Sequence, residues 1–146
     1  MRYINTLDYP RIELLEKVSG IYVITNEHTE NRIHQYVGQS WHLRNRYNQH
    51  IKDLRCNKHV NQFLQNAFNK YGERAFTFEV LEIVKISDLS KREAYWIEYF
   101  GGLSALYNFQ PVTYDNDNLV RGTNFGSSVY ARLKPSIDAG TLTLVT

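Results

Sequence analysis

Two short runs of apolar residues stand near the start of the chain, and each carries a tyrosine. They are residues 20–25, GIYVIT, and residues 33–38, IHQYVG, and the polar stretch NEHTENR separates them. Runs rich in β-branched and aromatic residues on both sides of a polar segment are typical of paired strands. The pattern predicts a β-hairpin whose loop is longer than a tight turn.

The pairing register of this hairpin can be estimated from the centre of its loop. With the turn centred near Thr29, antiparallel pairing places Tyr22 directly opposite Tyr36, and both side chains leave the same face of the sheet. Gly20 and Gly38 stand at the strand ends, where the lack of a side chain would let another backbone approach closely. The hairpin is therefore expected to present two phenols side by side.

Two amphipathic helices are predicted after the hairpin. Apolar residues over 41–54 recur at spacings of four, four and three, which is the periodicity of a helix with one buried face; they are Leu43, Tyr47, Ile51 and Leu54. A second stripe over 60–71 ends at Gly72, a residue that commonly terminates helices. The two segments predict consecutive helices.

A third strand and a third helix complete the pattern. Residues 75–84 alternate between apolar and polar positions and then change face, which indicates a strand with a bulge near Val80. Ser87 is expected to cap the following helix, and Gly101 is expected to end it. The helix has an apolar stripe formed by Leu89, Trp96, Ile97 and Phe100.

One acidic residue of this last helix lies on its apolar side. Glu93 follows Leu89 by four residues and precedes Ile97 by four, so its carboxylate projects along the buried stripe. Burial of an unpaired carboxylate costs several kcal/mol or more. Glu93 should therefore meet a cation or an arginine, such as Arg46 in a structural ion pair, or have access to a cleft.

Composition indicates one soluble domain in a reducing compartment. The chain has 146 residues, and 42% of them are hydrophobic and 22% charged, which is too polar for a membrane protein. The first residues contain no apolar signal segment, and the single cysteine, Cys56, has no internal disulfide partner. We expect an intracellular, cytoplasmic protein, in the cytoplasm of the host if a phage encodes it.

Positive charge is concentrated in one segment, although the formal net charge is only +2. Residues 42–59 contain five arginines and lysines and three histidines against a single aspartate. This pattern fits a solvated helix face or a patch that binds a polyanion. Charge alone does not distinguish these two interpretations.

The residues named above, taken as a set, resemble the GIY-YIG nuclease family. The name motif of that family is found here as GIY at Gly20 to Tyr22 and as YVG at Tyr36 to Gly38. The helix arginine of the family is similar to Arg46 in LRNRY, its glutamate to Glu93 in REAYWI, and its late asparagine to Asn108 in LYNF. Residues 59–72 are similar to the second helix of phage and intron-encoded homing endonucleases.

The resemblance implies a fold and an activity. The expected fold is α+β, with a three-stranded antiparallel sheet flanked by about three helices and followed by a short C-terminal extension. The expected organisation is a lead-in over 1–19 that packs on the core, a nuclease domain over 20–110, and an extension over 111–146. The expected activity is hydrolysis of phosphodiester bonds in double-stranded DNA with one Mg²⁺ or Mn²⁺ ion.

The resemblance also implies catalytic roles for six residues. Tyr22 would help to activate the attacking water, and Tyr36 would orient that water or hold a phosphate oxygen. Arg46 would bind the phosphate, and Glu93 would ligate the metal ion, which prefers oxygen ligands. The last two are His50, expected to assist proton transfer, and Asn108, expected to hold Glu93 or the phosphate unless it is a simple turn residue.

The remaining basic residues are candidates for DNA binding. His59 either contacts a phosphate or caps the second helix. Five further side chains either line the path of the DNA backbone or form ordinary solubilising surface: Arg44, Lys52, Arg55, Lys58 and Lys70. Neither the histidines nor Cys56 has the spacing of a zinc site, so no zinc is expected.

The function of the last 36 residues stays open. Residues 111–146 are rich in glycine, serine and asparagine, and they either pack on the core, add an edge strand, contact DNA, or belong to a fragment of a longer chain. For the whole protein, a homing or mobile-element endonuclease is expected. The alternatives are a nucleic-acid-binding module without turnover and a restriction or repair nuclease of the same superfamily.

Overall fold

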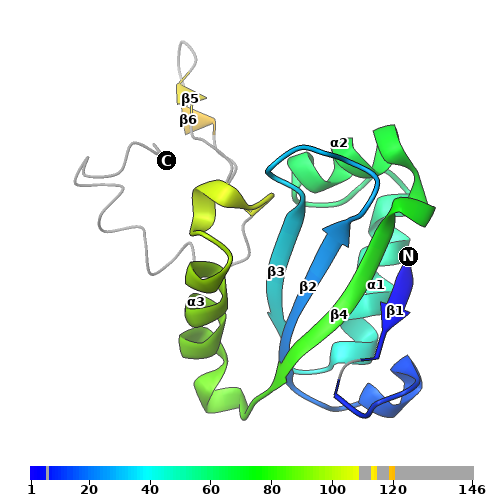
Figure 1. The fold of residues 1–146 in the computed structure, drawn as a ribbon, viewed down its shortest axis with the longest axis vertical. Helices are drawn as coiled ribbons and strands as arrows, with labels where there is room; N and C mark the ends of the chain where they lie inside the picture. The colour runs from blue at the N-terminus through cyan, green and yellow to red at the C-terminus, as the bar shows by residue number, and fades with distance from the viewer. Residues whose placement is uncertain (6, 109–112, 115–118, 121–146) are drawn as a thin grey trace.

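A twisted β-sheet with helices on both faces forms the centre of the molecule (Figure 1). This is a computed structural model, and it describes residues 1–5, 7–108, 113–114 and 119–120. The strands of the main sheet are β1 (Arg2–Ile4), β2 (Gly20–Asn26), β3 (Gln35–Ser40) and β4 (Phe76–Ile83). The α-helices are α1 (Leu43–Arg55), α2 (Gln62–Tyr71) and α3 (Leu89–Tyr99), and four 3₁₀ helices join them: η1 (Ile12–Leu15), η2 (Glu73–Ala75), η3 (Ile86–Asp88) and η4 (Leu103–Ala105).

The sheet has four strands and is mixed, which corrects the prediction of three antiparallel strands. Its order is β1-β4-β2-β3, and β1 pairs in parallel with β4 from Arg2 to Ile4. The prediction of an α+β fold with three helices is confirmed. The lead-in does more than pack on the core, because three of its residues form an edge strand. A three-residue strand is too short to show a periodic pattern.

The hairpin has a different register from the predicted one. Tyr22 pairs with Gly38, and Tyr36 pairs with Ile24. The loop is therefore centred on Glu30 and not on Thr29, which moves every partner by two residues. A shift of two preserves the face of each side chain, so both tyrosines still leave the same face.

The two faces of the sheet bury separate apolar clusters. The face covered by α1 and α2 includes Tyr22, Tyr36 and Phe78. The face covered by α3 includes Ile21, Val23 and Val37, which pack against Leu89, Ile97 and Leu106. Alternation along β2 and β3 sends neighbouring residues into different clusters. Two neighbouring residues on β3 therefore point to opposite faces of the sheet.

Most of the other local predictions are confirmed. Strand β4 has a register shift opposite Ile21 and Tyr22, where the extra residue Leu81 forms the irregularity expected near Val80. Gly72 has a φ of 87° at the end of α2, and Gly101 has a φ of 106° after α3, conformations that favour glycine. The expected cap at Ser87 is wrong, because Ser87 lies within η3 and the N-cap of α3 is Asp88.

Only two short segments of the C-terminal extension are described. Strands β5 (Thr113–Tyr114) and β6 (Leu119–Val120) pair with each other in an antiparallel two-stranded sheet. The other predictions for residues 111–146 lie outside the described residues. Among the residues that are described, none of the helices is both long and apolar enough to cross a membrane.

Candidate active site

The phenol of Tyr22 lies over Gly38 of the edge strand β3. Tyr22 is fully buried, and its ring stacks on Phe78 with 4.6 Å between the ring centroids. A Cβ atom on Gly38, its cross-strand partner, would overlap the Tyr22 hydroxyl and the adjacent ring carbons. Gly38 is therefore needed because the Tyr22 ring occupies the space where a side chain would stand. The close approach predicted at this glycine is made by a side chain and not by another backbone.

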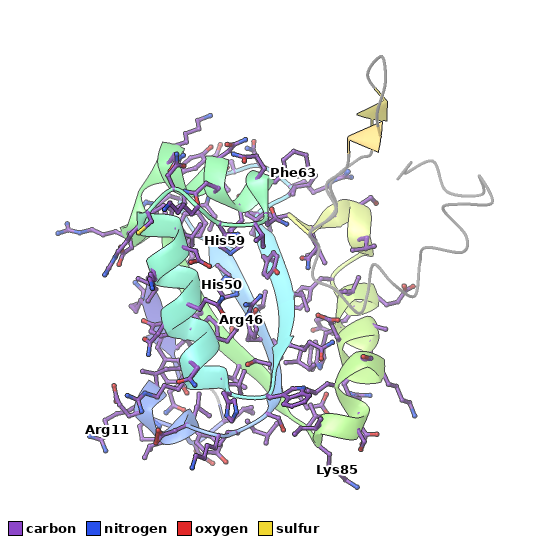
Figure 2. All side chains as sticks on the ribbon, turned by 180° about the vertical axis from the view of Figure 1, so that it is seen from behind. Arg11, Arg46, His50, His59, Phe63 and Lys85 are labelled. Carbon is purple, nitrogen blue, oxygen red and sulfur yellow. The ribbon has the colours of Figure 1, made fainter. Side chains whose placement is uncertain are left out.

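Arg46 and His50 meet the Tyr22 hydroxyl from α1. They are four residues apart on the helix, so both project from one side of it, and Figure 2 shows them between α1 and β3. The Nε atom of Arg46 donates to Tyr22 Oη at 3.2 Å, and Nη1 of Arg46 donates to Gln49 at 3.0 Å. The Nε2 atom of His50 lies 2.6 Å from Tyr22 Oη. The sequence-predicted tyrosine, arginine and histidine are thus in direct contact.

Tyr36 lies beside this group. Its ring makes an edge contact with His50, with 5.5 Å between the ring centroids, and only 2% of the residue is exposed. Burial raises the pKa of Tyr36, and the Arg46 guanidinium opposes that effect. Burial likewise raises the pKa of Tyr22, again opposed by Arg46. Both hydroxyls are therefore neutral at neutral pH in the absence of further charge.

Glu93 reaches the same edge from the other face of the sheet. It lies on α3, is 4% exposed, and its Oε1 accepts a hydrogen bond of 3.0 Å from Gln39 Nε2. Gln39 follows Gly38 on β3 and belongs to the α3 face. The Glu93 carboxylate is close enough to contribute to the raised pKa of Tyr22 and Tyr36, after burial as the main cause. The acid is thus buried, as predicted, and near the phenols.

Asn108 has partners other than the expected ones. Its Oδ1 accepts from the backbone N–H of Val37 at 2.9 Å, and its Nδ2 donates to the Val37 carbonyl at 2.7 Å. The backbone N–H of Tyr107 also donates to the carbonyl of Gln35 at 2.7 Å. Residues 107 and 108 therefore hydrogen-bond to the backbone of β3 along its outer edge, where the described residues form no further strand of the sheet. These contacts hold the strand between Tyr36 and Gly38 in place.

His59, predicted to contact a phosphate or to cap the second helix, is a second histidine in the centre of the site. His59 is 7% exposed, and its Nε2 lies 2.7 Å from His50 Nδ1. Its Nδ1 accepts from the backbone N–H of Asn61 at 2.9 Å. Asn61, and not His59, is the N-cap of α2, because its Oδ1 accepts from the Leu64 N–H. Contact between residues nine positions apart gave no signal in the sequence, since the loop between the helices sets their relative position.

Of the five other basic candidates, four lie on α1 or α2 and Lys58 lies in the loop between these helices. On α1, Arg44 and Arg55 lie about half a helical turn away from Arg46, and they form ion pairs with Glu16 at 3.2 Å and Glu73 at 2.7 Å. The remaining three are exposed: Lys52, Lys58 and Lys70. These side chains are not brought to the phenols, and their part in DNA binding stays a prediction.

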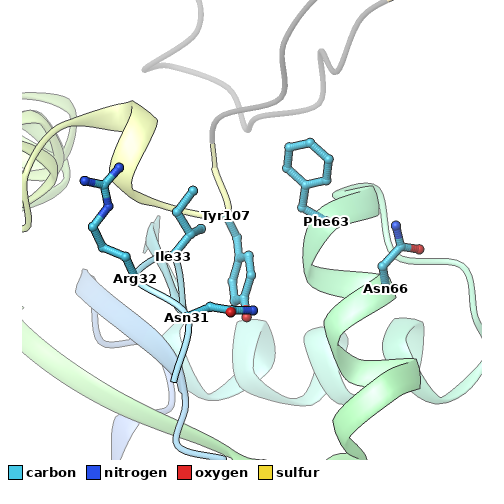
Figure 3. A pocket seen from close by; sticks show the side chains of 6 residues that line it. All are labelled: Asn31, Arg32, Ile33, Phe63, Asn66 and Tyr107. Carbon is cyan, nitrogen blue, oxygen red and sulfur yellow. The ribbon is translucent and has the colours of Figure 1, made fainter. Parts of the chain in front are cut away.

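A separate hollow opens beside the first turns of α2. It is lined by six residues, which Figure 3 shows: Asn31, Arg32, Ile33, Phe63, Asn66 and Tyr107. The predicted catalytic side chains do not line it. Its walls come from the hairpin loop, α2 and the segment that follows α3.

Comparison with known families defines the class of this site. A family model described as the GIY-YIG catalytic domain matches residues 18–108. The chain therefore belongs to the GIY-YIG family, which is a family of nucleases. This confirms the resemblance inferred from GIY, YVG, Arg46, Glu93 and Asn108.

The chain is also similar to two solved structures. The chain is similar to the catalytic domain of the homing endonuclease I-TevI at 31% sequence identity and a TM-score of 0.54, over 61% of this chain and 95% of that one. A mutant of the catalytic domain of the intron endonuclease I-TevI gives 30% identity and a TM-score of 0.54, over 62% of this chain and 91% of that one.

Proposed function

We propose that this protein is a divalent-metal-dependent DNA endonuclease of the homing or mobile-element type. The observation that carries the proposal is the convergence of two phenols, a guanidinium and a buried carboxylate at the β3 edge. Tyr22 and Arg46 are joined by a hydrogen bond of 3.2 Å on one face, and Glu93 is hydrogen-bonded to Gln39 on the other. Similarity to I-TevI catalytic domains supports the homing type.

The donor atoms at the site fit a hard divalent ion. Within the described residues, no group of three or more histidine, cysteine, aspartate or glutamate side chains could hold a metal ion. Mg²⁺ requires no such group, because it commonly binds one or two carboxylates, several waters and substrate phosphates. Glu93 would supply the carboxylate. When bound, the ion would stabilise the negative charge that develops on the leaving 3′ oxygen of the DNA.

The other side chains would act on the attacking water and on the phosphate. Arg46 offers a permanent positive charge and planar N–H donors beside both phenols, so it would bind the scissile phosphate. Tyr22 would take a proton from the attacking water. An unperturbed tyrosine has a pKa of about 10, and burial raises the pKa of Tyr22 further. Its ionisation therefore needs the positive charge of Arg46 and of the metal ion.

Cleavage of supercoiled plasmid tests the proposal. Purified protein is incubated with plasmid carrying a mapped site, or with a library of long inserts, in Mg²⁺, Mn²⁺ or EDTA. Nicked or linear product is expected with the metal ions only. Glu93→Ala should abolish cleavage, whereas Glu98→Ala, which changes an exposed carboxylate of the same helix, should leave it unchanged.

Three results would contradict parts of the proposal. Undiminished cleavage by Glu93→Ala would reject the role of Glu93 as metal ligand. DNA binding without nicking under any divalent ion would favour a binding module. Cut ends that map to a short, strictly conserved sequence would favour a restriction or repair enzyme over the homing type.

A further inference from the structure

Four polar side chains form one continuous hydrogen-bonded series through the interior. The series runs from Arg46 to Tyr22, then to His50, then to His59, and it ends at the backbone N–H of Asn61. We call this series the Tyr22 hydrogen-bond chain. Its last three members have almost no exposed surface, at 0% for Tyr22, 1% for His50 and 7% for His59. Water therefore has little access to these atoms, and each proton in the series must be placed on a group of the protein.

The backbone N–H of Asn61 determines the protonation of His59. This N–H can only donate, so Nδ1 of His59 must accept and cannot carry a proton. A neutral imidazole has one N–H, which then lies on Nε2. Burial and the charge of Arg46 lower the pKa of His59 to about 4, in agreement with a neutral ring at neutral pH.

The protonation of His50 follows from that of His59. The Nε2–H of His59 points at Nδ1 of His50, 2.7 Å away, so this nitrogen must accept. The two rings are nearly parallel, with 16° between their planes. Burial and the Arg46 charge lower the pKa of His50 well below its ordinary value, which keeps His50 neutral. Its single proton therefore lies on Nε2 and is donated to Tyr22 Oη.

We propose that His59 and the Asn61 backbone are positioning groups that hold His50 as a hydrogen-bond donor, so that Tyr22 accepts from both His50 and Arg46. In the opposite arrangement, Tyr22 would donate to His50 and His50 would donate to His59. His59 would then accept at both nitrogens and would have to be an anion. The observed contacts exclude that arrangement at any accessible pH.

This arrangement has a consequence for the chemistry of the proposed function, on which it rests. A neutral Tyr22 uses both lone pairs of its hydroxyl oxygen to accept from His50 and Arg46. Its own proton therefore points away from both of these side chains. If that proton passes to a water molecule bound with the DNA and leaves as H₃O⁺, the phenolate keeps both donors and gains a lone pair in the same direction. The phenolate can then accept a proton from the attacking water and become a phenol again. His50 thus stabilises the base and does not itself accept its proton.

Nuclear magnetic resonance tests the tautomers without any cleavage assay. The full chain, with ¹⁵N-labelled histidine, is measured at neutral pH in long-range ¹H–¹⁵N correlation spectra. Single His50→Gln and His59→Gln variants assign the two rings. The protonated nitrogen is expected to be Nε2 in both. A proton on Nδ1 of His50 would overturn the proposal, and this result is independent of whether the protein cuts DNA.

The pH dependence of cleavage tests the effect on Tyr22. His59→Leu removes the donor to His50, which frees His50 to accept from Tyr22 and so stabilises the neutral phenol. Loss of one hydrogen bond to a charged group predicts a fall in rate of about 10- to 100-fold at neutral pH, and the pH at which the rate levels off should move upward by about one to two units. His59→Gln, which keeps an N–H donor, should restore much of the rate. His28→Leu, at an exposed loop histidine, is the control.

A purely structural role for His59 predicts a different outcome. The His59→Leu rate would then fall by the same factor at every pH, and His59→Gln would not restore the pH profile. Either result would overturn the proposal. Spectra of both variants show whether the fold is intact, so a misfolded variant is recognised and the tautomer measurement decides.

Discussion

Substitution of Gly38 by alanine would place a methyl group where the Tyr22 hydroxyl now lies. The new Cβ would overlap the hydroxyl oxygen and two ring carbons of Tyr22. That ring cannot move freely, because it is fully buried and stacks on Phe78 with 4.6 Å between centroids. Overpacking of a buried site costs roughly 1–3 kcal/mol of stability. A displacement of about 1 Å at a catalytic group can reduce the rate about 100-fold.

A second buried glycine separates the effect on stability from the effect on the site. In Gly20→Ala the new Cβ would overlap the backbone carbonyl of Glu82, away from the Tyr22 hydroxyl. Both variants should lose stability in thermal unfolding, and the rate of plasmid cleavage is then measured well below both unfolding temperatures. Gly38→Ala should be slower by about 100-fold, and Gly20→Ala should cut at nearly the rate of the parent. Cleavage at the parental rate by folded Gly38→Ala would refute the assignment of Tyr22 to catalysis.

Two further predictions concern stability. Burial depresses the pKa of His59 from 6.5 to about 4. The unfolded chain therefore binds this proton first as the pH falls, so the free energy of unfolding should be constant above about pH 6.5 and decrease by roughly 3 kcal/mol toward pH 4. Urea unfolding at several pH values should show this slope for the parent and a smaller one for His59→Gln; equal slopes would contradict the burial effect. Asn108→Asp should be less stable by about 2–4 kcal/mol, because a carboxylate cannot donate to the buried Val37 carbonyl. Thermal unfolding beside the exposed control Asn66→Asp tests this, and equal losses would show that the Val37 contacts contribute little.

The sequence was sufficient for most of the helices and strands and for the face on which several candidate site residues lie. Helical periodicity placed Arg46 and His50 on one side of α1, because residues four apart always share a side. The inward position of Glu93 on α3 followed from the same rule. Alternation in the strands put Tyr22 and Tyr36 on one face of the sheet. This prediction is correct although the predicted register was wrong, because a shift of two residues leaves each side chain on the same face.

Contacts between distant segments could not be predicted in the same way. The position of the loop centre depends on the backbone conformation of residues 27–34, so the true partner of Tyr22 was missed. Strand β1 is only three residues long and is recognised by its pairing with β4. The double hydrogen bond of Asn108 to Val37 and the contact of His59 with His50 likewise depend on how loops fold back. An isolated polar residue in the sequence gives no sign of such a partner.

The site is built around one edge strand, and this explains why glycine is found at position 38. Tyr22, Arg46 and His50 belong to the face covered by α1, whereas Glu93 and Gln39 belong to the face covered by α3. A sheet normally separates side chains on its two faces. The separation is smallest at the outer edge, and the missing side chain of Gly38 lets the Tyr22 phenol lie over the edge strand itself. Because residues 107 and 108 hold the same strand from outside, the edge is rigid where the two sets of groups approach each other. In the proposed function, a buried base and a buried acid would thus act on one phosphate while each is positioned by its own apolar cluster.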